Sequence, residues 1–222
     1  MLHRHRLENT KMRLICLAAL AAGMATCAHA QDSGPWSVRL GLSHIGMDES
    51  ADISLGGSKV PGASFTADDD LTPTIGVGYR FSERFSAEFT VGVPPTAVLT
   101  GTGPLAGTKL GDVTYGPATL TALYHFPKFG DGLDAYIGGG VNYTLIFDTK
   151  DRAINDFKVD NAFAPVLQAG IEGPLANKTG WFLDVKYIPL ETKARGTVGG
   201  APAKADITLN PLIATAGIVL HF

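Results

Sequence analysis

Cysteine and long apolar runs are scarce in this chain of 222 residues. The two cysteines, Cys16 and Cys27, lie within the first thirty residues, and no later stretch approaches the roughly 20 consecutive apolar residues of a transmembrane helix. The first absence excludes a small fold that is stabilised by disulfides, because a chain beginning at Gln31 has none. The second absence excludes a bundle of membrane-spanning helices.

Positive charge is also scarce beyond residue 30. The whole chain has 18 Lys and Arg against 21 Asp and Glu, and residues 1–30 hold four of the former and one of the latter. The remainder therefore carries 14 basic and 20 acidic residues, a formal net charge of −6. No basic stripe is left to neutralise phosphates, so nucleic acid is not an expected partner.

The first thirty residues have the three parts of a secretory signal. Basic residues lie between His3 and Arg13, and the apolar run Leu14–Met24 follows them. Ala28 and Ala30 then provide the small side chains that signal peptidase recognises. This pattern predicts a cleaved signal peptide over residues 1–30 and a mature domain over 31–222.

Two alternatives remain at this end of the chain. Met12 is a possible start of translation, since a complete signal also follows it. Cys27 is a possible lipidation site, although the residues before it fit a lipoprotein cleavage box less well than Ala28-His29-Ala30 fits signal peptidase.

Apolar and polar residues alternate along most of the rest of the chain. In Trp36–Ser43 the even positions are apolar, and in Phe85–Val93 the odd positions are. Successive side chains of a strand point to opposite faces, so each such segment has one apolar face and one polar or small face. Eight segments show this pattern: residues 36–43, 75–81, 85–93, 118–126, 135–143, 167–172, 181–188 and 212–222.

The connections between these segments are short and long in turn. Residues 82–84, 127–132 and 173–180 are short, whereas the other four connections are long and rich in Gly, Asp, Thr, Ala and Lys. Short turns at one end and long loops at the other are typical of outer-membrane barrels. We therefore expect an all-β fold, an eight-stranded antiparallel transmembrane β-barrel with short periplasmic turns, long extracellular loops and both termini in the periplasm. The four long loops are expected at residues 48–71, 94–114, 148–162 and 191–208.

A water-soluble barrel or sandwich would show the same alternation with its apolar face turned inward. Aromatic residues at the segment ends, such as Trp36, Phe81, Phe126 and Tyr187, favour the membrane barrel, because aromatic girdles mark the two membrane interfaces. The chain also ends on an aromatic residue, Phe222, at the end of an alternating strand. This terminal residue resembles the signal that the outer-membrane assembly machinery recognises.

Several segments together resemble the OmpW family of outer-membrane proteins. Gly34–Gly41 is similar to that family's G-x-W-x-V-R-x-G, and Gly116–Leu120 to its L-P-P-T-L. Tyr136–Thr144 resembles Y-x-G-x-G-x-N-Y, and Asp184–Lys193 resembles D-V-x-Y-x-D-I-x-T. Leu209–Pro211 stands where the family has L-D-P. The chain departs from these patterns at Pro189, Asn210 and Glu172, which lie near strand ends. The resemblance implies passive uptake of small hydrophobic molecules across the outer membrane.

The alternation also assigns the side chains that face the barrel interior. Near the turns these carry both signs of charge, and we expect them to close the barrel as a lumen floor network of Arg39, Arg80, Glu88, His125, Glu172 and Asp184. Towards the long loops the inward residues are apolar. We expect them to form an apolar cup of Ile45, Met47, Tyr115, Ile146, Val166, Ile188, Leu190, Leu209 and Ile213.

Eight strands enclose a space just wide enough for side chains or one small ligand. A cup above a charged floor suggests that small hydrophobic solutes enter from outside and leave sideways into the bilayer. The alternative is that these apolar residues simply fill the barrel, which would then be a structural or surface-interaction protein, an adhesin or receptor. Expected partners are outer-membrane lipid, lipopolysaccharide, the assembly machinery and hydrophobic solutes.

An enzyme is the third class of function. His44, His125 and His221 are the candidate bases, with Ser43 or Ser86 as nucleophile, but the chain has no Gly-x-Ser-x-Gly motif. We therefore expect no catalytic activity. No cofactor or metal is expected either, since consecutive acids such as Asp68-Asp69-Asp70 lack the alternate spacing of a coordination loop.

Overall fold

The structure, a computed structural model, describes residues 34–222, so the predicted signal peptide lies outside the described residues. The described part is almost entirely β-strand. It contains one short 3-10 helix, η1 (Gly103–Leu105), and no helix long and apolar enough to cross a membrane.

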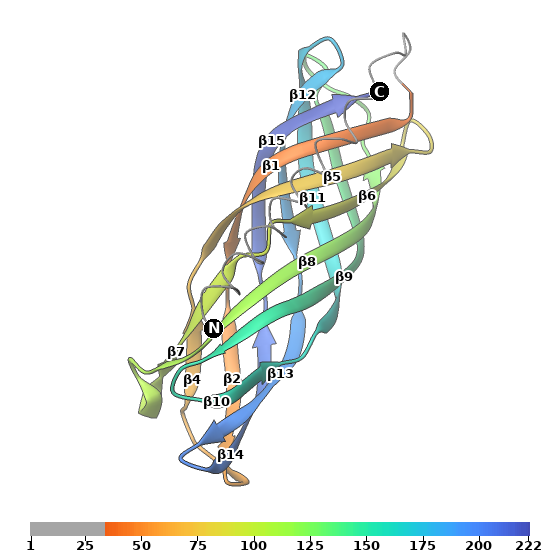
Figure 1. The fold of residues 1–222 in the computed structure, drawn as a ribbon. Helices are drawn as coiled ribbons and strands as arrows, with labels where there is room; N and C mark the ends of the chain where they lie inside the picture. The colour runs from red at the N-terminus through yellow and green to blue at the C-terminus, as the bar shows by residue number, and fades with distance from the viewer. Residues whose placement is uncertain (1–33) are drawn as a thin grey trace, which may run out of the picture. The chain divides into compact units, whose positions relative to one another are not determined.

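Eight antiparallel strands close into a barrel, as the sequence predicts (Figure 1). The ring runs β8-β6-β5-β1-β15-β12-β11-β9, and pairing of β9 with β8 closes it. Its strands are β1 (Trp36–Gly46), β5 (Asp70–Arg80), β6 (Phe85–Gly92), β8 (Lys109–His125), β9 (Asp134–Asp151), β11 (Ala162–Ala176), β12 (Thr179–Tyr187) and β15 (Leu212–His221).

The register of the barrel places the apolar side chains outside. Leu40 of β1 lies opposite Ile218 of β15 and Ile75 of β5, and all three belong to the apolar face. The next residue, Arg39, faces the interior and is buried. A shift by one residue would turn Arg39 towards the lipid, so the alternation in sequence fixes the register.

Three tight connections lie at the end of the barrel where β1 begins and β15 ends, which we call the turn end. They comprise residues 81–84, 126–133 and 177–178. The third is shorter than the predicted 173–180, because β11 continues through an irregularity after Pro174 to Ala176. Lys178 has a positive φ of 58°, which a two-residue turn between antiparallel strands requires.

The opposite end, the loop end, differs from the prediction. Most of the four expected loops is strand: β2 (Glu49–Leu55), β3 (Ser58–Lys59), β4 (Ser64–Ala67), β7 (Thr96–Thr102), β10 (Asn155–Val159), β13 (Leu190–Val198) and β14 (Ala201–Leu209). A second sheet has the order β10-β13-β14-β2-β3, while β7 pairs with β8, and β4 with β7. Here the outer faces meet water, so the apolar alternation that reveals the other strands is missing.

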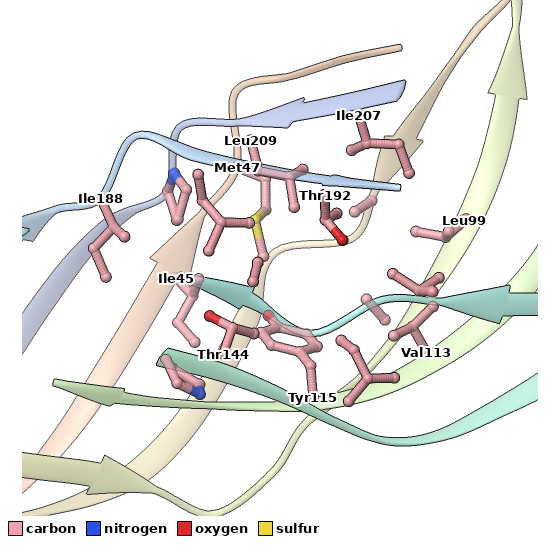
Figure 2. A pocket seen from close by; sticks show the side chains of 18 of the residues that line it. Ile45, Met47, Leu99, Val113, Tyr115, Thr144, Ile188, Thr192, Ile207 and Leu209 are labelled. Carbon is pink, nitrogen blue, oxygen red and sulfur yellow. The ribbon is translucent and has the colours of Figure 1, made fainter. Parts of the chain in front are cut away.

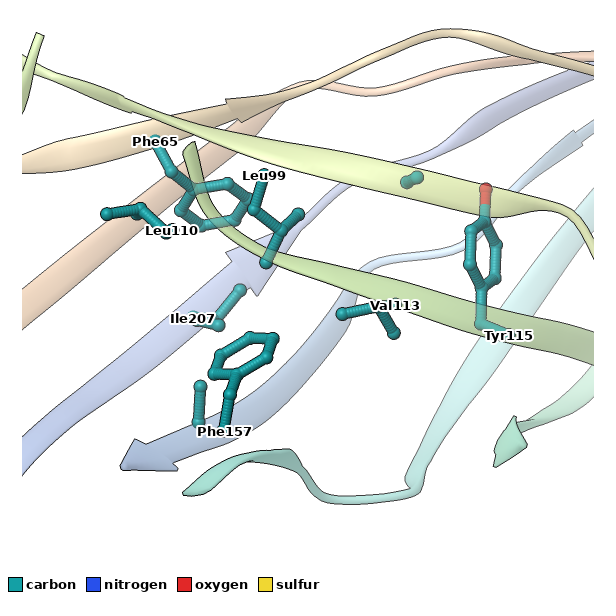
Figure 3. Packing of buried hydrophobic residues seen from close by; sticks show 9 residues of the cluster. Phe65, Leu99, Leu110, Val113, Tyr115, Phe157 and Ile207 are labelled. Atoms are coloured by element: carbon teal, nitrogen blue, oxygen red, sulfur yellow. The ribbon is translucent and has the colours of Figure 1, made fainter. Parts of the chain in front are cut away.

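The interior of this extension is apolar (Figure 3). Its buried cluster includes Phe65, Leu99, Val113, Phe157 and Ile207, which come from β4, β7, β8, β10 and β14. Each of these strands contributes one buried face to the cluster, which explains why they remain ordered beyond the barrel ring.

The outer surface of the ring is strongly apolar. Phe163 is 67% exposed and Leu71 65%, and many further large apolar residues are exposed around them. Aromatic residues gather at the turn end, where Trp36 lies edge-on to Tyr79 at 4.8 Å between ring centroids. Such a band would be an aggregation site in water, whereas it matches the lipid-facing surface of a membrane barrel.

Glycine makes room for large side chains inside this narrow barrel. A Cβ atom added to Gly170 would contact the ring of Tyr136 and lie 2.7 Å from the carbonyl oxygen of Leu183. Tyr136 is only 2% exposed and sits at the centre of the floor described below.

Gly170→Ala should therefore destabilise the barrel by about 1–3 kcal/mol, because the added methyl group overpacks the interior. The free energy of unfolding, measured by urea titration in lipid vesicles, tests this. Gly46→Ala is the matched control, since the nearest atoms to its added Cβ lie 3.9 Å away. Equal stability of the two variants would contradict this packing argument.

Candidate functional site

An apolar cavity lies inside the loop end (Figure 2). Its unoccupied space is about 780 Å³, a figure that includes open solvent, and this falls in the size range of ligand-binding pockets. The cup residues in its wall are Ile45, Met47, Tyr115, Ile146, Ile188, Leu190, Leu209 and Ile213. Among the polar residues in the same wall are Tyr115, Thr144, Asp160 and Thr192.

The structure brings the nine cup residues together with one exception at the wall. Val166 does not line the cavity, although it is 1% exposed and packs in one cluster with Ile45, Ile188 and Ile213. Val166 therefore supports the wall from behind. The sequence argument missed the contributions of Phe65, Leu99 and Ile207, because these residues lie in segments expected to be loops.

Below the cup, Arg39 is the central residue of the floor. Its guanidinium lies 2.9 Å from the carboxylate of Glu88 and 2.8 Å from that of Glu172. It also donates to the hydroxyl of Tyr136 at 2.7 Å, and this hydroxyl donates to Asp184 at 2.9 Å. Arg39 is 7% exposed and Glu88 3%, so these are ion pairs without water. Such pairs hold only when each partner is matched.

A second cation completes this part of the network. The ammonium group of Lys186 lies 2.7 Å from Asp184 and 3.2 Å from Glu88. Gln168 donates to the same two carboxylates, at 2.7 Å and 3.1 Å. Its amide oxygen accepts from the hydroxyl of Thr121 at 2.6 Å. Each carboxylate thus has several donors, which stabilises the charged forms in a dry interior.

A smaller group around His125 lies nearer the turns. The Nε2 atom of His125 is 2.8 Å from the Ser86 hydroxyl, and its Nδ1 atom is 2.9 Å from the carboxylate of Asp134. Arg80 contacts the same Nδ1 atom at 3.0 Å and Asp134 at 2.8 Å. All six predicted floor residues therefore lie in the two groups, and all but the half-buried Arg80 are buried.

Every strand of the ring contributes to this floor. His221 of β15 pairs with Glu172 at 2.9 Å, which brings in the last strand. Asp134, Tyr136, Gln168 and Lys186 belong to the network but are missing from the predicted set. Their inward register is readable from the alternation, whereas their pairing partners lie on strands distant in sequence.

Ser86, His125 and Asp134 have the hydrogen-bond order of a hydrolytic triad. A nucleophile must reach its substrate, however, and Ser86 is 9% exposed, His125 2% and Asp134 4%. None of the three lines the cavity, and Arg80 competes for the His125 Nδ1 atom. The geometry suits a structural cluster. Ser43 bonds the hydroxyls of Thr74 and Thr215, and His44 points outward, 3.6 Å from Asp69.

Among residues 34–222, no group of three or more His, Cys, Asp or Glu side chains could hold a metal ion. The site is therefore defined by two layers of different chemistry, an apolar cavity and a charged floor.

A model of the OmpW family matches residues 32–222. The chain belongs to the OmpW family. It is 37% identical over 212 residues to the dibenzothiophene metabolism operon protein PahQ of Pseudomonas aeruginosa, covering 95% of this chain and 99% of PahQ. It is 33% identical to the outer membrane protein AlkL of Ectopseudomonas oleovorans, covering 84% and 81% of the two chains.

The fold is similar to that of solved family members. The crystal structure of OprG from Pseudomonas aeruginosa superposes with a TM-score of 0.78 at 26% sequence identity, covering 86% of this chain and 96% of OprG. This OmpW-family chain is thus an outer-membrane β-barrel.

Arg39→Met should destabilise the barrel by about 3–5 kcal/mol, because Glu88 and Glu172 would lose their shared buried cation. Lys193→Met is the control: the Lys193–Asp206 pair is solvent-exposed, so its loss should cost less than about 1 kcal/mol. Urea titration of the folded barrels in lipid vesicles measures both. The account of the floor is wrong if the two variants unfold at the same urea concentration.

Proposed function

We propose that this barrel mediates passive uptake of small hydrophobic molecules through the apolar cavity, with lateral exit into the bilayer. The observation that carries the proposal is the stacking of an apolar cavity on a charged floor within one closed barrel. An apolar solute gains from entering the cavity, whereas the floor offers it only ionic groups that are already paired.

The wall of the barrel has a break at the height of the cavity. The ladder between β11 and β12 ends at Leu167 and Tyr187. Among the described residues, the next backbone hydrogen bond on this seam runs from the Asp160 N–H to the Lys193 carbonyl at 2.9 Å. The flanking segments, residues 161–166 and 188–192, thus face each other without a ladder.

Apolar side chains line both edges of this seam. Ala162 and Val166 on one edge and Ile188 and Leu190 on the other are buried in one cluster. Outside, Phe163 is 67% exposed on the lipid-facing surface. Proline at 165 and 189 removes two backbone donors from the two edges, one from each. We infer that solutes leave the cavity here.

The names of two relatives support an apolar cargo. PahQ is named for dibenzothiophene metabolism, and dibenzothiophene is an apolar aromatic compound. The name of AlkL says only that it is an outer membrane protein, and its likeness to this chain extends over most of both sequences.

Orientation and partners complete the proposal. The turn end and both termini face the periplasm, the loop end projects through lipopolysaccharide, and Phe222 is recognised by the assembly machinery. A structural or surface-interaction role is the second candidate, favoured by the ordered strands of the loop end, which present a broad outer face.

Ala162→Trp should reduce uptake of n-octane by intact cells to the level of cells without the protein, because the indole would fill the cavity beside the seam. Initial uptake of labelled octane is measured, and heat-dependent gel mobility shows that the barrel has folded. Phe163→Trp, one residue along on the lipid-facing side, should leave uptake unchanged. Undiminished uptake by a folded Ala162→Trp barrel would contradict the route and favour the surface role.

A further inference from the structure

One hydroxyl in the cavity wall retains hydrogen-bonding capacity. The Tyr115 hydroxyl donates to Asp70 at 3.0 Å, and the Thr192 hydroxyl donates to the backbone carbonyl of Asp160 at 2.7 Å. The Asp160 carboxylate in turn accepts from Arg195 at 2.6 Å. Thr144 differs from these residues. It accepts a hydrogen bond from the Asn142 amide at 2.8 Å, and no acceptor for its own proton is found among residues 34–222.

Two more polar atoms without partners lie directly behind Thr144. Asn142 of β9 and Thr119 of β8 are opposite each other in the barrel wall and are 0% and 4% exposed. Within the part of the chain that the structure describes, neither Asn142 Oδ1 nor Thr119 Oγ1 has a hydrogen-bond partner. Buried polar atoms are nearly always paired, so two neighbouring exceptions need a physical explanation.

Their height in the barrel is also specific. Thr144 and Pro117 form the rung above, and both line the cavity (Figure 2). Thr121 lies on the rung below and is already bonded to Gln168 of the floor network. The unpaired atoms therefore lie at the base of the apolar cavity, between the cup and the floor.

We propose that Thr144, Asn142 and Thr119 form a hydrogen-bonding subsite for the single hydroxyl group of an otherwise apolar molecule. This rests on the proposed function, since it assigns a substrate class to the same cavity. A hydroxyl group both donates and accepts, so it can donate to Asn142 Oδ1 and accept from the Thr144 hydroxyl. An ether or ketone can only accept. The preferred ligand is thus a medium-chain alcohol, whose alkyl chain lies along the cup.

The test measures binding of 1-octanol and of n-octane to the full protein, exported and purified from outer membranes and placed in lipid vesicles, with protein-free vesicles as blank. The double substitution Thr144→Val and Asn142→Leu keeps side-chain volume nearly constant and removes both polar groups. It should weaken octanol binding about threefold to tenfold, the equivalent of one or two hydrogen bonds, and leave octane binding unchanged.

Thr114→Val is the matched control, because Thr114 lies on the same strand as Thr119 and bonds Thr96 on the outer surface. Its octanol-to-octane ratio should equal that of the unaltered protein. The inference is overturned if the double variant binds octanol as well as before, the result expected when an internal water alone occupies the subsite. An equal loss of octane and octanol overturns it as well, because the effect is then one of packing.

Binding and transport separate the two proposals. A barrel that binds octanol through these residues but carries neither compound into cells would contradict the proposed function and support the subsite. A barrel that carries octane while binding octanol no better than the double variant does would contradict the subsite alone.

Discussion

The paired charges inside the narrow end of the barrel constrain the rest of the structure. Arg39 and Lys186 are shared among Glu88, Glu172 and Asp184, and none of these side chains has water to replace a lost partner. Since all eight strands contribute to the floor, a register error in any one strand would leave a buried charge unmatched. The floor therefore selects one register for the whole ring, and it closes the lumen to straight passage.

The loop end follows the opposite chemistry. Its strands leave the ring with water on their outer faces, so their stability depends on the apolar cluster between them and on the ladders of the second sheet. Apolar side chains that meet from two sheets leave the cavity between them, and the cup joins it from below. Floor and cavity are consequences of one alternation along the strands whose inward residues change from charged to apolar.

The sequence predicts the ring well because lipid imposes a strong pattern. Segments such as Trp36–Ser43 and Phe85–Val93 must be apolar on every outward position, and the predicted ring of eight strands is confirmed. The same reason explains the failure at the loop end. In β13 the inward residues include Thr192 and Ala194 and the outward ones Lys193 and Arg195, so small and charged residues resemble a loop.

Site residues could be predicted by face and not by partner. Inward register identifies Arg39 and Glu172, whereas the bridging role of Tyr136 depends on a glycine, Gly170, that leaves space for its ring. Val166 likewise faces inward without reaching the cavity, because wall position depends on strand tilt and neighbouring volume. Period-2 patterns carry no such information.

The account's central claim is that this barrel admits apolar molecules and excludes polar ones. The most direct test compares the uptake of n-octane and of a hydrophilic probe of equal size by cells with and without the protein folded in the outer membrane. The account predicts faster entry of octane alone. Unchanged rates for both probes, or an equal rise in both, would contradict it, since the first means no route and the second a water-filled pore.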